Sequence, residues 1–533
     1  MLLFFLQSCS ESNLSNSDKS VFNYNESAGI SSLDPAFANN QENIWWVNQI
    51  FDGLVEMDDQ MNIVPLIAKH WNIDSTASSY TFTLRDDVYF HNSDCFEEGI
   101  GRRVVAEDFV YSFNRIYQQK VASPGKWIFN QVNPENPFVA LNDSTLQINL
   151  KEPFAPFLSI LSMQYCAVVA HEAEEYYKKE FARNPIGSGP FTFNFWLDNN
   201  TLALLKNEDF FQKDEKGNAL PYLDAIKVEF IRDKSVMYLD FLKGNYDMIS
   251  SLHPSYKDEL LTKQGALKTV HQKDIYLQKQ DYLKTDYLGF YIDSLKESPL
   301  LDKRVRQAFN LAINRSNMVL FIKNNTARSA DLGFVPPSIV TKNQEAFKYE
   351  YDLNKARNLM SEAGYSNGKG FPELNLATTE AYVDLCEYAQ SELKKLGVNV
   401  VIEVMPTSNQ RRAVAQGEKL FFRKSWIADY ADAENFLGLY YSPNFAPNGS
   451  NYTHFSNDDF DQLYEKAMIS NDLAAREDLY TQMDSILCDE APVIPLFYDQ
   501  VIRFIRKDIS GLNSNAMNLL DLKKVRKGEK GIE

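Results

Sequence analysis

The sequence predicts an α/β protein, and two patterns indicate this class. In the first half, residues 80–84 (YTFTL) and 145–150 alternate between apolar and polar side chains, as half-buried strands do. In the second half, apolar residues recur at helical spacing in segments that alternate with short apolar strands. At roughly 150 residues per domain, a chain of this length has room for about three domains.

The first half is predicted to be rich in strands, with a few helices between them. Residues 25–35 are predicted to form a strand and a turn, and residues 63–71 lead into the strand at 80–84. Helices are expected where the apolar spacing changes to that of a helix, at 43–51, 106–117 and 170–181.

The second half is predicted to alternate helices with buried strands. Gly364 and Gly397 each follow a helical stripe, at the place where a glycine commonly ends a helix. The predicted helices cover residues 305–313, 356–363, 385–396, 460–468 and 479–487. The predicted strands cover residues 398–404 and 492–498.

Charge and motifs exclude several classes of function. The net charge of −18 argues against nucleic-acid binding, which needs a basic surface. No run of about 18 apolar residues is present, so no membrane-spanning helix is predicted. Phosphate-binding loops, zinc-protease motifs and nucleophile elbows are absent, and the six histidines are scattered. We therefore predict a protein that is not an enzyme and that uses no metal and no cofactor.

The N-terminus contains a candidate lipidation site. Residues 1–6 are apolar and precede Gln-Ser-Cys, which resembles the lipobox of bacterial lipoproteins with Cys9 as the lipidated residue. Residues 10–20 are polar and fit a solvated tether. Two readings stay open for the remaining cysteines, disulfides or buried free thiols. They are Cys95, Cys166, Cys386 and Cys488.

Eight segments, in order along the chain, resemble the peptide-binding branch of the solute-binding proteins of bacterial ABC transporters. Each segment alone is weakly specific, and their shared order makes the resemblance specific. They are residues 32–35 (SLDP), 50–55 (IFDGLV), 63–71 (IVPLIAKHW), 80–91 (YTFTLRDDVYFH), 106–113 (AEDFVYSF), 186–191 (IGSGPF), 304–315 (RVRQAFNLAINR) and 426–430 (WIADY).

The resemblance implies a two-lobed, periplasmic-binding-protein-like clamp with an extra domain inserted in the first lobe. The lobes of such proteins close on the ligand by a hinge motion. The expected parts are a signal remnant and tether (1–20), a discontinuous first lobe (21–51, 187–279 and 499–533), the extra domain (52–186) and a second α/β lobe (280–498). The implied protein is a monomer, anchored by lipid in the periplasm or cell envelope, that captures short peptides for a membrane permease.

The resemblance also implies ligand contacts in the second lobe. Asp429 occupies the family position whose carboxylate binds the ammonium of the peptide, and a solvated turn is its alternative. Trp426 and Tyr430 flank it and are expected to pack on the ligand or in the core. Arg423 is expected to meet the carboxylate of a short peptide, or else to be a surface residue. Asn451, in the loop that follows, is a further candidate contact.

Three more candidates come from the first half of the chain. Asn39 and Gln41 follow the SLDP segment at the spacing of a first-lobe contact, where the family also uses an acidic residue. Tyr111 matches a tyrosine that approaches the ligand, and a core position is its alternative. Other functions stay open at this point: a nickel-chelate, haem, opine or oligosaccharide binder, a peptide sensor, or a secreted hydrolase.

Overall fold

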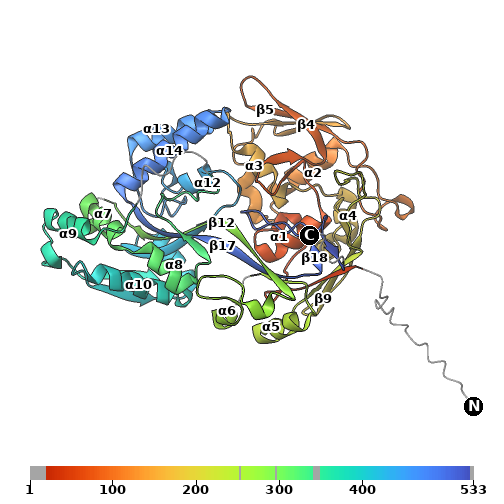
Figure 1. The fold of residues 1–533 in the computed structure, drawn as a ribbon. Coiled ribbons are helices and arrows are strands. Elements are labelled where there is room, and N and C mark those ends of the chain that lie inside the picture. Colours follow the sequence, from red (N-terminus) through yellow and green to blue (C-terminus); the bar gives the residue numbers. More distant parts are fainter. Residues whose placement is uncertain (1–19, 251–253, 294–296, 340–348, 529–533) are drawn as a thin grey trace, which may run out of the picture.

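The computed structural model describes residues 20–250, 254–293, 297–339 and 349–528. Two bodies lie side by side and are joined by two long strands, β12 (Ile275–Phe290) and β17 (Val493–Arg506) (Figure 1). We call the body formed by described residues up to 274 and from 507 onward the first lobe. The body formed by residues 291–492 is the second lobe.

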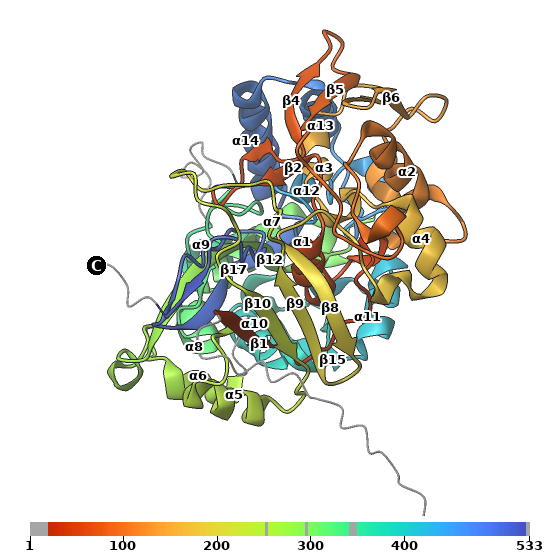
Figure 2. The ribbon, with the colours of Figure 1, turned by 90° about the vertical axis from the view of Figure 1, so that its right-hand side faces the viewer.

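The first lobe contains a four-stranded sheet packed against helix α1 (Gln41–Ile50). The Asn40 side chain accepts a hydrogen bond from the backbone N of Asn43 at 3.0 Å, which fixes the start of α1. Trp45 and Trp46 are buried, and each packs 5.7 Å from the Tyr24 ring. Figure 2 faces this sheet, whose order is β1 (Val21–Asn25), β10 (Ala225–Glu229), β9 (Thr201–Lys206) and β8 (Phe191–Leu197).

A second sheet lies in the segment predicted to be the extra domain. It is antiparallel, and the predicted alternation is confirmed because Tyr80, Phe82 and Leu84 are buried. Helix α2 (Ala106–Tyr117) has the predicted bounds and packs on this sheet. The strand order is β4 (Ala68–Ile73), β5 (Ser79–Leu84), β7 (Thr145–Asn149) and β6 (Phe138–Asn142). The same segment contains β2 (Val55–Met57), β3 (Ile63–Pro65), α3 (Phe157–Leu161) and α4 (His171–Tyr177).

The second lobe is built on a mixed sheet with helices on both faces, and this sheet continues through the connecting strands to β11 (Met248–Ser250) of the first lobe. Its order is β11, β17, β12, β16 (Phe421–Ile427), β14 (Leu374–Thr378) and β15 (Val400–Val404), with β13 (Ala327–Ser329) beside β17. One core contains residues of α7 (Lys303–Ala312), α8 (Arg315–Lys323), α9 (Leu353–Glu362) and α10 (Val383–Lys394). The other contains residues of α11 (Thr407–Ala415), α12 (Glu434–Leu437), α13 (Asp458–Ile469) and α14 (Leu473–Glu490).

The helices and strands predicted for the second half are present, but α14 begins six residues earlier and β17 ends eight residues later than predicted. β15 was wrongly expected to be buried, because Val401 and Val404 are exposed. Gly364 follows α9 at a φ of 91°, and Gly397 lies shortly after α10 at 81°. These left-handed values favour glycine. A Cβ at Gly397 would also lie 2.2 Å from the carbonyl oxygen of Asn367, so close approach of the backbone adds a second reason for glycine there.

The connection between the lobes is a pair of antiparallel strands with an irregular centre. β12 and β17 pair from Ile275 and Arg506 to Gly289 and Val493, and their register shifts between Asp281 and Thr285. The predicted lobe boundaries after residues 279 and 498 fall inside these strands, near the shift. A bulge locally disrupts a ladder and bends the strand, so this is the natural place for a hinge.

Three features of the fold differ from the expectations. The helix expected at 170–181 is split, because Lys178 has a φ of 51° and a 3-10 helix (Lys178–Arg183) follows α4. The strand expected at 25–35 instead ends at Asn25. The length of β12, and helices α5 (Lys234–Lys243) and α6 (Pro254–Leu260), were not predicted.

The cysteines that the structure describes are free thiols. Cys166 and Cys386 are buried, Cys95 and Cys488 are half-buried, and Cys9 lies outside the described residues. Burial raises the pKa of the Cys386 thiol to about 11, which keeps it protonated and unreactive at neutral pH. In the described ranges, no helix combines the length and the apolar character that crossing a bilayer requires.

Candidate functional site

The candidate site is centred on strand β16 and the loop that follows it. β16 carries Arg423 and Trp426, and the loop carries Asp429 and Tyr430 before α12 begins at Glu434. This part of the second lobe faces the first lobe, because the ring of Trp127 lies 6.3 Å from that of Tyr430. Three of the predicted contacts, Trp426, Asp429 and Tyr430, are therefore brought together where the lobes meet.

One edge of β16 is only partly covered by a neighbouring strand. β14 pairs with β16 at Phe421 and Phe422 alone, and no other described strand continues along that edge. Helix α11 approaches it, and Gln410 Nε2 donates a hydrogen bond to the carbonyl oxygen of Arg423 at 2.8 Å. Ser425 and Ile427 follow without a strand on this side. A partly open edge next to polar side chains is suited to accept an extended peptide backbone.

Asp429 is held in place through its backbone, which leaves its carboxylate available. Its N–H donates to Asn435 Oδ1 at 3.1 Å, and the indole Nε1 of Trp426 donates to the same oxygen at 2.9 Å. The carboxylate is exposed and takes part in none of the ion pairs among the described residues. Asp429 is accessible to solvent, but the protein around it partly desolvates the carboxylate. This desolvation, partly offset by hydrogen bonding to Asn435, raises the pKa of Asp429 to about 6.

The first lobe approaches Asp429 through Tyr165. Burial, and next the nearby charge of Asp429, raise the pKa of Tyr165 to about 12. Tyr165 belongs to a 3-10 helix (Gln164–Cys166), and its ring packs where a Cβ on Gly125 would otherwise lie, 2.4 Å away. The exposed carboxylate of Asp429 therefore lies between the two lobes.

Tyr430 is anchored from behind by a buried carboxylic acid. Its hydroxyl and that of Tyr464 both donate to Glu434, which is buried. Burial raises the pKa of Glu434 to about 7. With its hydroxyl engaged, Tyr430 offers its ring to the interface between the lobes, where Trp127 meets it.

Arg423 lies in a charge cluster on the opposite face of β16 from Trp426. It forms an ion pair with Asp286, whose side chain is 0% exposed, and its guanidinium lies 3.1 Å from the centre of the Tyr382 ring. The other contacts of the cluster join three more residues. They are Lys284–Asp286 at 3.1 Å, Lys284–Asp499 at 2.8 Å and Lys323–Asp499 at 2.9 Å. The charge of Arg423 is thus already matched inside the protein.

Lys424 is not among the ligand contacts predicted from the sequence, yet it lies on the same face of β16 as Trp426. Its Nζ lies 3.6 Å from the centre of the Tyr452 ring. Burial, and next the charges of Arg411 and Arg423, lower the pKa of Lys424 to about 8. The alternation of side chains along a strand is the signal that links Lys424 to Trp426 in sequence.

The other predicted residues take part in internal hydrogen bonds or lie in the first lobe. Asn451 is 0% exposed, and its side chain donates to the carbonyl oxygen of Phe455 at 2.9 Å. Gln41 exchanges two hydrogen bonds of 2.8 Å with Asn518. Tyr111 donates to Glu174 at 2.5 Å, and Asn39 is exposed just before α1.

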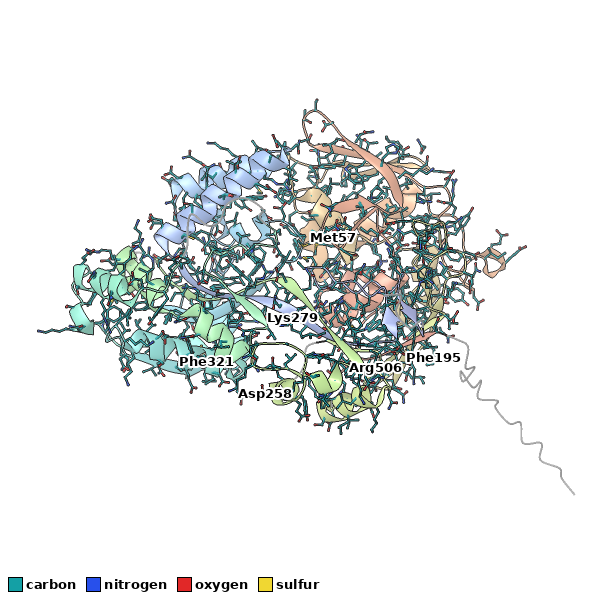
Figure 3. All side chains as sticks on the ribbon, in the orientation of Figure 1. Met57, Phe195, Asp258, Lys279, Phe321 and Arg506 are labelled. Atoms are coloured by element: carbon teal, nitrogen blue, oxygen red, sulfur yellow. The ribbon has the colours of Figure 1, made fainter. Side chains whose placement is uncertain are left out.

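The lobes also touch on the far side of the hinge, where α6 meets the end of α8. Asn324 Nδ2 donates to Asp258 Oδ1 at 2.8 Å, and Lys257 Nζ donates to the carbonyl oxygen of Ile322 at 3.2 Å. Figure 3 labels Asp258 beside Phe321 of α8, with Lys279 of β12 above them. With the Trp127–Tyr430 contact, the two lobes therefore meet on more than one side.

A separate polar cavity of about 670 Å³ lies in the first lobe and is lined by none of the predicted site residues. Asp52 and Lys523 line it, and Lys523 pairs with Glu56 at 2.6 Å. In the parts of the chain that the structure describes, no group of three or more histidine, cysteine, aspartate or glutamate side chains is arranged to hold a metal ion. The β16 region is therefore the better candidate for ligand binding.

Comparison with curated proteins finds relatives that are named for the peptides they bind. The chain is 25% identical over 480 residues to the dipeptide-binding protein of Escherichia coli (strain K12), covering 87% of this chain and 86% of the relative. It is 25% identical over 495 residues to the glutathione-binding protein GsiB of Shigella flexneri, covering 91% and 90%.

Solved structures show the same architecture. The periplasmic binding protein DppA from Helicobacter pylori, in complex with peptide STSA, has a TM-score of 0.75 at 27% identity and covers 96% of this chain and 98% of its own. HbpA2 from Haemophilus parasuis has a TM-score of 0.83 at 22% identity, with 96% and 100% covered. The expected two-lobed α/β binding-protein fold is confirmed.

A family model agrees with these likenesses. It is described as "Bacterial extracellular solute-binding proteins, family 5 Middle" and matches residues 62–448, which is most of the chain. The match covers most of the extra-domain segment and includes strand β16. The chain belongs to the family 5 extracellular solute-binding proteins of bacteria.

Proposed function

We propose that this protein captures short peptides outside the cytoplasmic membrane and delivers them to the permease of an ABC importer. The observation that carries the proposal is Asp429, an exposed carboxylate between the lobes that none of the described ion pairs uses. The names of the relatives, which include dipeptide- and glutathione-binding proteins, support the same class of ligand.

Asp429 is suited to the ammonium group of a peptide. A cation beside a desolvated carboxylate favours its charged form, so binding would lower a pKa that the surrounding protein holds near 6. Asn435 fixes the backbone of Asp429 and the Trp426 indole together, which prepares the site before the ligand arrives. Because these groups are already ordered in the free protein, ordering them does not weaken ligand binding.

The open edge of β16 supplies the second half of the proposal. A peptide that lies along Ser425 and Ile427 would pair its backbone with the strand, and this mode holds peptides without regard to their side chains. Trp426 and Tyr430 would cover it, with Asn39 approaching from the first lobe. We propose that Arg423, Asn451, Gln41 and Tyr111 shape the site through the internal contacts that they make.

Closure of the lobes about β12 and β17 would bury the ligand. The register shift between Asp281 and Thr285 provides the flexible point, and the Asn324–Asp258 and Trp127–Tyr430 contacts would hold the closed form. We propose the lobe boundaries at 279/280 and 498/499 from the same register shift, and the extra-domain boundaries at 51/52 and 186/187 from the separate sheet β4–β5–β7–β6.

We further propose that Cys9 carries a lipid and that residues 10–20 tether a monomer to the membrane surface. The Gln-Ser-Cys sequence and the polar composition that follows it support this proposal. A lipid chain and a flexible tether would keep the receptor near its permease. Metabolic labelling with a fatty-acid analogue, compared between the full chain and Cys9→Ala, tests the anchor.

Ligand capture is tested with the purified protein and a panel of di- to pentapeptides. A peptide present at a hundred times its Kd stabilises the folded protein by about 2.7 kcal/mol, which appears as a rise in melting temperature. Native mass spectrometry of the same preparations gives the stoichiometry, expected to be one peptide for each chain. A panel that produces no thermal shift and no bound mass would contradict the proposal.

A further inference from the structure

Strand β16 contains a lysine whose role the proposed peptide capture leaves open. Lys424 lies on β16, two residues before Trp426, and strand alternation puts both side chains on one face of the sheet. The Lys424 ammonium lies 3.6 Å from the centre of the Tyr452 ring, which supplies a favourable surface but no negative charge. Lys424 therefore places a cation on the face of β16 that also carries Trp426.

Lys424 has no carboxylate partner among the described ion pairs. Its charged neighbours are Arg411 and Arg423, which are both cations, and burial adds to their effect in lowering its pKa to about 8. Arg411 is exposed on α11, and its neighbour Gln410 ties that helix to β16 through the 2.8 Å bond to Arg423 O. A partly desolvated cation flanked by cations is stabilised by any anion that reaches it.

Arg423 does not need an anion from the ligand, because the protein already supplies its counter-charge. Asp286 and Asp499 are shared by Arg423, Lys284 and Lys323, and this cluster lies on the other face of the strand. A ligand carboxylate at Arg423 would compete with Asp286, whose side chain is 0% exposed and which already neutralises the guanidinium. Among the described ion pairs, Lys424 has no such competitor.

The spacing along β16 relates Lys424 to Asp429. Lys424 and Trp426 are two residues apart on the strand, which is about 7 Å. This distance equals the spacing between alternate side chains of an extended peptide. Five residues span at most about 18 Å, so Lys424 and Asp429 are within the reach of a peptide of a few residues. A ligand whose amine lies at Asp429 and whose backbone follows the strand therefore brings its next groups to Lys424.

We propose that Lys424, supported by Arg411, binds a carboxylate of the ligand, so that the site selects short peptides with an anionic group a few residues from their amine. This inference rests on the proposed peptide capture and names the part of the ligand that the second lobe recognises. The carboxylate has two possible sources, the C-terminus of a short peptide or an acidic side chain. The chemistry at Lys424 is the same for both.

The test uses three tripeptides and titration calorimetry. The ligands are Ala-Ala-Ala, its C-terminal amide, and Ala-Glu-Ala amide. The proteins are the native chain, Lys424→Met, the charge-keeping Lys424→Arg, and Lys394→Met, which removes an exposed lysine from α10 as a control for net charge. Circular dichroism and melting temperature confirm that each variant is folded.

Lys424→Met is expected to weaken one or both of the carboxylate-bearing ligands about tenfold to a hundredfold. It should leave the affinity for Ala-Ala-Ala amide unchanged, with Lys424→Arg restoring most of the loss and Lys394→Met matching the native chain. Loss confined to Ala-Ala-Ala identifies the C-terminal carboxylate, and loss confined to Ala-Glu-Ala amide identifies an acidic side chain.

Two results from Lys424→Met would overturn the inference while leaving peptide capture intact. One is native affinity for all three ligands in Lys424→Met. The other is an equal loss of affinity for all three ligands in Lys424→Met, which would mean that the lysine shapes the site without recognising the ligand's carboxylate. If the native chain binds none of the tripeptides and no member of the di- to pentapeptide panel, the proposed function itself fails, and the inference fails with it. Binding of other panel members without any of the three tripeptides would overturn the inference alone.

Discussion

The indole Nε1 of Trp426 donates a hydrogen bond of 2.9 Å to the side-chain oxygen of Asn435. The same oxygen accepts the backbone N–H of Asp429, so one amide group fixes both the aromatic surface and the carboxylate of the candidate site. Asn435 is buried at the start of α12, where solvent does not compete for these bonds. The geometry of the site thus depends on a residue that does not itself face the ligand.

Asn435→Ala is predicted to weaken peptide binding more than it weakens the fold. The substitution leaves two donors without their acceptor, which costs about 1–3 kcal/mol in stability, and it frees the loop that carries Asp429. Binding measured by calorimetry should fall about tenfold or more. Asn444→Ala is the matched control, since Asn444 donates one 2.9 Å bond to Gly438 O in the same region. Equal binding losses in the two variants would argue against a positioning role.

The contact between α6 and α8 is predicted to stabilise the closed form. Asp258→Ala removes the acceptor of the 2.8 Å bond from Asn324, and Asn324→Gly removes the donor while keeping a left-handed backbone at a φ of 47°. A double-mutant cycle on ligand affinity should give a coupling energy of about 0.5–1.5 kcal/mol. In solution scattering with ligand present, both single variants should show a larger radius of gyration than the native protein. A coupling energy near zero would mean that the bond does not act in closure.

Peptide affinity is predicted to fall as the pH falls through 6. Asp429 must be ionised to bind an ammonium group, and its pKa of about 6 in the free protein means that it takes up a proton below that pH. The peptide amine stays charged there, since its pKa is near 8. Affinity should drop by up to about tenfold for each pH unit below 6, and it should be nearly constant from about pH 7 until the peptide amine begins to lose its proton near pH 8. In Asp429→Asn this dependence should vanish; its persistence would assign the titration to another group.

Much of the fold could be predicted, because its elements bury one regular face. α2 has the predicted bounds, and β5 shows the predicted alternation. β12 was missed because its first half is half-buried on both sides and shows no alternation, as the run Gln278, Lys279 and Gln280 illustrates. Such a strand is defined by its pairing with β17, more than 200 positions along the chain, and no local pattern reports it.

The sequence locates the centre of the candidate site but not the residues that support it. Asp429, Trp426 and Tyr430 lie within five residues of one another and match a family motif, so they can be selected from the sequence alone. Asn435 acts through a loop geometry that spacing does not reveal. Arg423 and Lys424 are adjacent and similar in charge, and only the fold shows that they lie on opposite faces with different partners.

The most direct test of the account is the affinity of Asp429→Asn for a peptide that the native protein binds, measured by titration calorimetry at pH 7.5. Asparagine keeps the size of the side chain and removes the charge. We predict an unchanged melting temperature without ligand and a loss of about 1.5–3 kcal/mol in binding free energy, which is about tenfold to a hundredfold in Kd. An unchanged Kd would remove Asp429 from the site and contradict the account.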